Sequence, residues 1–84
     1  EFQLYPNPTY NIAKILISNL DNGQYKLILY NIIGKKIWDR EIEVNGQTII
    51  RENFNFLAKG TYLIAIQDEN GNVLKTTRLN IISV

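Results

Sequence analysis

The stretch NGQYKLILYNIIGKKI, residues 22–37, decides the fold. It opens on the turn-forming pair Asn22-Gly23 and then alternates two sets of side chains, Tyr25, Leu27 and Leu29 against Lys26, Ile28 and Tyr30. Side chains two residues apart share one face of a β-strand, so this alternation predicts a half-buried strand. Gly34 permits a tight reversal into a second strand. The stretch therefore predicts a β-hairpin.

The same pattern recurs along the chain, because glycines follow one another at intervals of 11, 12, 14 and 11 residues. Such spacing is typical of consecutive short strands, and the Asn-Gly pairs predict type I′ turns. The resulting strands cover residues 2–5, 12–18, 24–31, 35–44, 47–53, 61–68 and 73–82. The stretch holding Phe54, Phe56 and Leu57 has no clear period, which leaves a crossover loop or a single turn between sheets.

Seven such strands in 84 residues predict an all-β, immunoglobulin-like antiparallel β-sandwich. It forms one domain over residues 1–84, with residues 1–3 as candidate linker or cloning residues. The predicted core includes Leu27, Leu29, Tyr62, Ile64, Ile66, Leu79 and Ile81. Apolar side chains expected outside the core, together with open sheet edges, predict a homodimer; they are Ile28, Tyr30, Trp38 and Ile82.

Composition excludes several classes of function. The net charge is +1 and no basic stripe exists, so nucleic-acid binding has no electrostatic basis. Histidine and cysteine are absent, which removes the common nucleophilic triads and the usual zinc ligands. The acidic residues are scattered, and so small a sandwich has little room for a cleft. We therefore expect no catalysis, no cofactor, no metal and no small-molecule substrate.

Two residue groups suggest binding at first sight. Asp68 to Asn72 resembles the start of an EF-hand loop, but Gly71 is fourth where glycine is needed sixth, so a hairpin turn is favoured. Trp38 faces outward if Ile37 faces the core, and an exposed indole could stack on a sugar. Large aromatic side chains more often cover the outer face of a sheet, which is the favoured interpretation.

Four patterns occur in a fixed order: Leu4-Tyr5-Pro6-Asn7-Pro8, then Leu27 to Ile37, then Leu57 to Ile66 with Lys59-Gly60-Thr61-Tyr62, and a last strand with Lys75 and Arg78. Over residues 4–82 the chain resembles the type A C-terminal sorting domain of the type IX (Por) secretion system of Bacteroidetes. The positions that match the family motifs are Tyr5, Pro6, Asn7, Pro8, Gly34, Lys35, Lys59, Gly60 and Tyr62.

The motif positions also have physical readings. Pro6 and Pro8 predict a stiff polyproline-like lead into the sandwich. The Tyr62 hydroxyl is expected to anchor a turn. The chain departs from the family at Asn31, where Asp is common, and at Arg78, where Lys is usual. It departs also at Glu52, where an apolar residue is typical, and this leaves the register of the strand over 47–53 open.

The resemblance implies a secretion signal fused behind an N-terminal cargo. The domain would be recognised in the periplasm by the outer-membrane shuttle and translocon of the type IX system, and the cargo would be secreted or displayed at the cell surface. A sortase-like peptidase would then remove the domain. The family places its determinants in the last segment, Val73 to Val84, which makes Lys75, Thr77, Arg78, Leu79 and Ile81 the export-signal candidates. The alternatives are a carbohydrate-binding or adhesion module and an inert spacer.

Overall fold

The computed structural model describes residues 1–82, and the fold is all β. Its strands are β1 (Phe2–Tyr5), β2 (Ile12–Ile17), β3 (Gly23–Asn31), β4 (Lys36–Val44), β5 (Thr48–Asn53), β6 (Gly60–Gln67) and β7 (Val73–Ile81). Each predicted strand exists, and each boundary lies within one residue of its predicted place. No helix among the described residues is long and apolar enough to cross a membrane.

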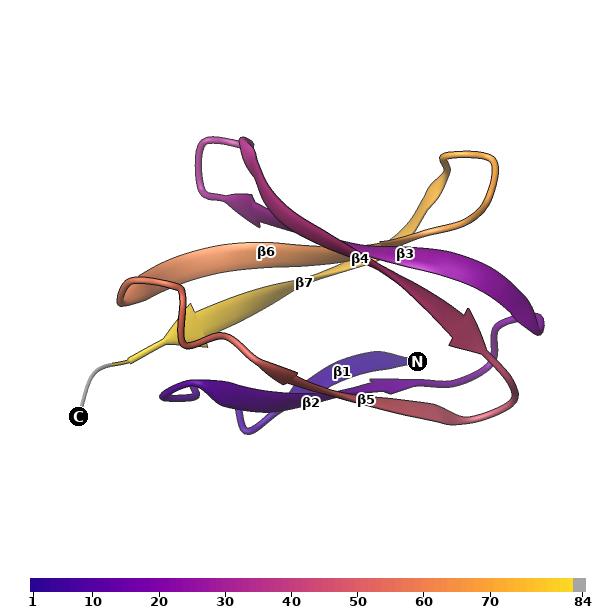
Figure 1. Ribbon diagram of the computed structural model, residues 1–84, viewed down its shortest axis with the longest axis horizontal. Helices are drawn as coiled ribbons and strands as arrows, with labels where there is room; N and C mark the ends of the chain where they lie inside the picture. Colours follow the sequence, from indigo (N-terminus) through magenta and orange to yellow (C-terminus); the bar gives the residue numbers. More distant parts are fainter. Residues whose placement is uncertain (83–84) are drawn as a thin grey trace.

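The strands form two antiparallel sheets that stack face to face, as Figure 1 shows. One sheet has the order β1-β2-β5 and the other the order β4-β3-β6-β7. In immunoglobulin terms β1, β2 and β5 occupy the places of strands A, B and E, while β3, β6 and β7 occupy those of C, F and G. The predicted antiparallel immunoglobulin-like sandwich is confirmed.

The core fills the space between the sheets. Six of the seven predicted core residues are buried, and Tyr62 is half-buried and packs against them. Phe54, which the sequence left unassigned, has no exposed surface and is one of the largest fully buried side chains. Its backbone N–H donates to the Asn11 carbonyl over 2.7 Å, which fixes the start of the β5–β6 connection.

Two predicted outward-facing residues do not lie in exposed patches. Leu29 pairs with Trp38 but Tyr30 pairs with Lys36, so Ile37 is the extra residue of a bulge. The Trp38 side chain therefore lies on the core-facing side of β4, as that of Leu29 does on β3. Its ring packs edge-on against the Phe54 ring, with the two ring centroids 5.9 Å apart. The outward orientation predicted for Trp38 is wrong. Ile28 is buried because it lies between Asp39 of β4 and Ala65 of β6, at the centre of the four-stranded sheet.

The hairpins β3–β4 and β6–β7 are built alike. In each, an Asx side chain begins a five-residue loop, Asn31 to Lys35 and Asp68 to Asn72. Its Oδ1 accepts from the backbone N–H groups two and four residues later, over 2.9 to 3.1 Å. A glycine with φ of 87° stands fourth in both loops, and a bulge adjoins each. We call these the twin hairpins.

The type I′ prediction for the Asn-Gly pairs is wrong. Among the described residues, Asn19 is the single non-glycine residue with positive φ, so the asparagines of these pairs lack the angle that a type I′ turn needs. In the β6–β7 loop, Gly71 donates its N–H to the Asp68 carbonyl, which makes a type I turn closed by a left-handed glycine. Asn70 thus occupies an ordinary turn position.

Candidate functional site

β7 is an edge strand of the four-stranded sheet, and it carries all five export-signal candidates. Leu79 and Ile81 are buried in the core, and Thr77 is half-buried beside them. Lys75 and Arg78 are exposed. Lys75 pairs with the core residue Ile66, whereas Arg78 pairs with the exposed Leu63, so the two cations lie on opposite faces of the sheet. The last two residues of the predicted segment, 83 and 84, lie outside the described residues.

The N-terminal motif contacts the outer edge of β7. The Asn7 side-chain amide donates to the Arg78 carbonyl over 2.7 Å, and its Oδ1 accepts from the Asn80 N–H over 3.0 Å. Thr9 extends these contacts along the same edge of β7. Its N–H donates to the Asn80 carbonyl, and its carbonyl accepts from the Ile82 N–H, both over 2.9 Å. We call these contacts of Asn7 and Thr9 the N-terminal clasp. The clasp pairs the outward backbone groups of the last strand from the Arg78 carbonyl onward.

The clasp corrects the predicted role of the prolines. Residues 6–8 form bends that turn the chain from β1 toward β7, and the Tyr5–Pro6 and Asn7–Pro8 peptide bonds are cis. Because residues 6–8 are bends and not an extended run, the predicted polyproline-like lead is wrong. Tyr5 itself ends β1 opposite Lys14 and keeps 41% of its surface exposed. The motif thus places one asparagine side chain against the last strand.

The clasp leaves one half of the β7 edge open. In the described chain, hydrogen bonds to that edge involve Arg78, Asn80 and Ile82 alone. Backbone groups of an edge strand alternate in direction, so the N–H and C=O of Thr76 point outward as those of Arg78 and Asn80 do. Residues 73–77 therefore offer a short unpaired strand edge.

Two tyrosines brace the loops that precede central strands. The Tyr62 hydroxyl donates to the Ala58 carbonyl over 2.7 Å, as predicted, and forms a tyrosine corner at the start of β6. The Tyr25 hydroxyl donates to the Asp21 carbonyl over the same distance at the start of β3. Gly60 precedes Tyr62 and Gly23 precedes Tyr25 by two residues. The repeated Gly-x-Tyr spacing is a signal that the sequence prediction used only once.

The remaining motif positions support turns. Gly34 has φ of 87°, a left-handed conformation that strains any other residue, although a Cβ there would meet nothing within 4 Å. Lys35 follows it and donates its backbone N–H to Asn31 Oδ1, while its side chain is exposed. Lys59 is likewise exposed, immediately before Gly60. These positions shape the loops and leave their ammonium groups in solvent.

The departure at Glu52 is accommodated between the sheets. Glu52 pairs with the fully buried Ala13, so its side chain points inward at the rim of the core. There its carboxylate forms a 3.0 Å ion pair with Arg40 of β4. The Arg40–Glu52 ion pair, which joins the two sheets, thus stands where the family pattern has an apolar side chain. The register of β5, left open by the sequence, is thereby fixed.

The Asp68 carboxylate is occupied by its own turn. Hydrogen bonds from Asn72, and a further one from the Asn70 N–H, lower the pKa of Asp68, while desolvation opposes them. Among residues 1–82 no three metal-ligating side chains lie together. The hydrogen bonds within residues 68–72 confirm the favoured hairpin-turn interpretation.

The lowered pKa of Asp68 predicts a pH-dependent contribution to stability. The contribution is present above the unfolded-state pKa of about 3.9 and is lost as the pH falls through the folded-state pKa. Asp68→Asn keeps an acceptor oxygen but cannot titrate. We expect the urea midpoint of wild type to exceed that of Asp68→Asn above about pH 4 and the difference to narrow below it, because wild type alone loses the contribution of an ionised carboxylate. Asn31→Asp in the twin hairpin should gain the same acid sensitivity, and parallel curves for all three proteins would contradict the account.

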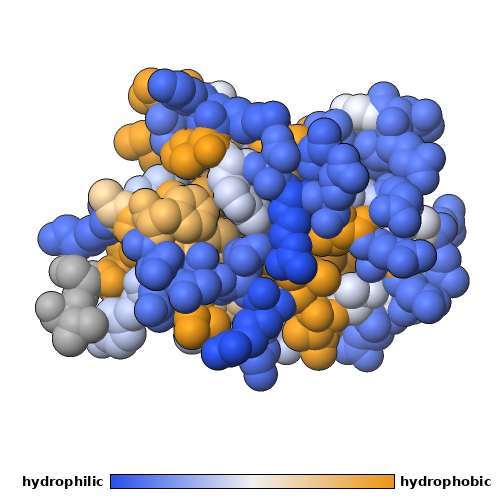
Figure 2. Space-filling view, in the orientation of Figure 1, coloured by the Kyte–Doolittle hydropathy of each residue, from blue (hydrophilic) through white to orange (hydrophobic). Residues whose placement is uncertain are grey.

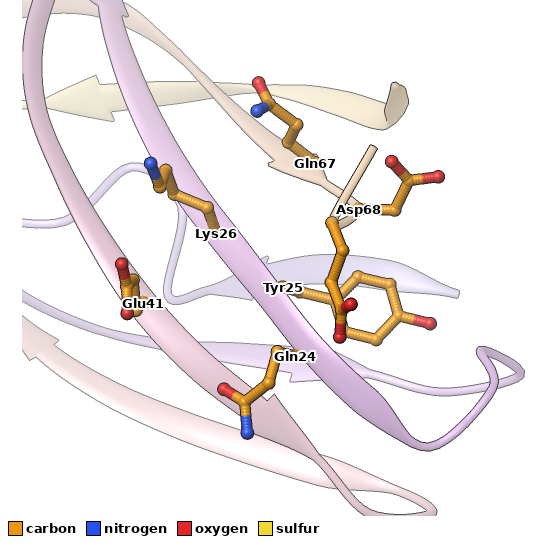
Figure 3. Close-up of a pocket in the computed structure, with 7 residues that line it drawn as sticks. Gln24, Tyr25, Lys26, Glu41, Gln67 and Asp68 are labelled. Carbon is orange, nitrogen blue, oxygen red and sulfur yellow. The ribbon is translucent and has the colours of Figure 1, made fainter. Parts of the chain in front are cut away.

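The two best-defined hollows of the described surface are both open to solvent. The best-defined hollow, of about 430 Å³, is open and lies where β3, β4 and β6 approach the β6–β7 loop. Figure 3 shows its polar lining, which includes Gln24, Lys26, Glu41, Gln67 and Asp68.

A cluster of three aromatic rings lies elsewhere and consists of Trp38, Phe54 and Phe56. Trp38 and Phe54 turn inward, so only Phe56 of these three is largely exposed, at 52%. These three aromatic side chains therefore do not form an exposed platform on which a sugar ring could stack.

Comparison with known proteins places the chain in a family. Residues 3–81 match the family model described as "Secretion system C-terminal sorting domain". Searches among curated proteins and among solved structures find no match. The family match spans nearly all of the sandwich, including the N-terminal clasp, the twin hairpins and β7. The chain therefore belongs to the C-terminal sorting domains of the type IX secretion system.

Proposed function

We propose that the export machinery recognises this sorting domain through the open edge of β7, residues 73–77, by adding a strand to it. The family is one of sorting signals, which implies a fused N-terminal cargo that is exported to the surface or secreted. In the proposal, the outer-membrane shuttle and the translocon bind the domain during periplasmic transit, and a sortase-like peptidase removes it afterwards.

One observation carries the proposal, namely that the clasp covers the edge of β7 from Ile82 back to the Arg78 carbonyl and leaves residues 73–77 uncovered. An unpaired edge invites pairing with another chain, and proteins usually protect such edges. Backbone hydrogen bonds would supply affinity, and side chains on either face would supply specificity. Leu79 and Ile81 hold the strand in the core, Thr77 borders it, and Lys75 and Arg78 present one cation on each face.

The test changes the outward edge without disturbing the sheet. Thr76→Pro removes an N–H that points away from β6, and proline is tolerated on such edges. We expect the folded variant, fused behind a reporter with its own signal peptide, to stay in the periplasm of a type IX host. Thr76→Val keeps the N–H and should export normally. Lys75→Gln with Arg78→Gln tests the charges. Normal surface delivery of a folded Thr76→Pro fusion would overturn recognition through this edge.

A further inference from the structure

We propose that the β3–β4 tip, residues 32–33, is a second docking element, an apolar plug that enters a pocket rimmed by carboxylates on a protein partner. The partner is a component of the export machinery, so the inference rests on the proposed function. Ile32 is 73% exposed and Ile33 is 83% exposed, the largest exposed fractions among the exposed large apolar residues of the described chain.

The twin hairpins show that the turn does not require these isoleucines. The β6–β7 loop has the same hydrogen bonds and the same glycine conformation, yet Glu69 and Asn70 stand where the β3–β4 loop has Ile32 and Ile33. Two branched apolar side chains in water stabilise neither the loop nor the core. Their exposure therefore needs an explanation outside the isolated domain.

Several backbone donors of the β3–β4 loop are already hydrogen-bonded within the loop. Asn31 accepts hydrogen bonds from the N–H groups of Ile33 and Lys35 through its side chain, and from Gly34 through its carbonyl. The Asn31 N–H in turn donates to the Lys35 carbonyl over 2.9 Å. With the N–H groups of Ile33, Gly34 and Lys35 already paired inside the loop, fewer backbone donors lose water when the tip enters an apolar pocket.

Charge around the two ends of the domain indicates the chemistry of the partner. Lys35, Lys36 and Lys59 lie at the end that carries the β3–β4 tip, and of these Lys36 pairs with Asp39. Asp21, Asp68 and Glu69 line one hollow at the opposite end. In Figure 2 apolar atoms are visible beside the β3–β4 tip, whereas hydrophilic residues cover the β6–β7 tip. An apolar plug beside lysines fits a pocket with an acidic rim.

A protein pocket accounts for the tip better than a lipid surface does. The two isoleucine side chains together hold fewer carbons than a myristoyl chain, and one such chain gives only marginal membrane binding. A preformed pocket buries the same side chains completely and fixes their orientation. The tip is thus suited to docking on a folded partner.

The experiment exchanges the tip for that of its twin. Ile32→Glu with Ile33→Asn is made in the full reporter fusion, and Glu69→Ala with Asn70→Ala is the matched control at the other tip. We expect the first variant to keep its thermal midpoint and to lose export about tenfold or more, because both side chains lose their burial. The control should export as wild type does. Lys35→Glu should also reduce export.

Each contrary result has a definite meaning. Export of the exchanged tip at the wild-type level would overturn the plug alone. Wild-type fusion that co-floats with vesicles of phosphatidylcholine and phosphatidylglycerol, when the exchanged variant does not, would replace the protein partner by a membrane. Light scattering that reports wild-type oligomers absent from the variant would replace it by a second copy. Failure of the wild-type fusion to leave the periplasm would overturn the proposed function and the plug with it.

Discussion

Phe54→Ala should destabilise the domain by about 3–5 kcal/mol, the usual cost of truncating a fully buried phenylalanine. Phe54 has no exposed surface and packs edge-on against Trp38 between the two sheets. Small domains have only about 5–15 kcal/mol of total stability, so this variant loses a large share of it. Urea unfolding followed by fluorescence of Trp38, the chain's one tryptophan, measures the shift.

Phe56 provides the matched control for this substitution. It is aromatic, lies two residues away and has its ring centroid 6.2 Å from that of Phe54, yet it is 52% exposed. Phe56→Ala should therefore cost about 1 kcal/mol or less. Equal urea midpoints for the two variants would show that Phe54 does not fill the core as described.

Ile64→Ala should cost about 2–5 kcal/mol, because the cavity it leaves lies at the centre of the four-stranded sheet. Ile64 is fully buried in β6, where it pairs with Leu29 on one side and Thr77 on the other. Both neighbouring strands are held by hydrogen bonds, so they cannot close around the missing atoms. A calorimetric scan should show a clear fall in the thermal midpoint.

The neighbouring Leu63 tests which face of β6 is buried. Its side chain lies on the outer face and is 36% exposed, so Leu63→Ala should change stability much less than Ile64→Ala. A larger effect for Leu63→Ala than for Ile64→Ala would mean that the facing of the strand is inverted. The pair thus separates strand orientation from general sensitivity to truncation.

Strand positions were predictable because two local signals agreed. Glycines and Asx residues mark the turns, and apolar side chains alternate between them, as in the stretch from Tyr25 to Tyr30. The inward set there, Leu27 and Leu29, was assigned correctly because its period of two extends over the whole strand. Local signals of this kind fix strands and their facing wherever the register is regular.

Register failed where a bulge intervened. A bulge adds one residue and reverses the facing of the residues beyond it, and Ile37 is such an added residue, so Trp38 turned inward. Phe54 escaped prediction because it lies in a connection without periodicity. Its burial results from the meeting of both sheets around it, a tertiary effect that no local pattern encodes.

The candidate site was predictable in part. The sequence located the last strand and its exposed cations, but not the clasp, because Asn7 and Arg78 are 71 residues apart in the chain. The twin hairpins were within reach, since Asn31 and Asp68 each precede a glycine by three residues. Only the comparison of the two loops, however, shows that the isoleucines at one tip are dispensable for the turn.

The N-terminal clasp also determines when the first motif can become ordered as the chain is synthesised. The partners of Asn7 are Arg78 and Asn80, so both hydrogen bonds of its side chain wait until nearly the entire domain has been translated. A chain that ends before Arg78 can pair β1 with β2 but leaves the Asn7 amide without its acceptor. The ordering of the first motif is in this way conditional on a complete last strand, and a domain truncated before Arg78 loses contacts at its first motif as well as in β7.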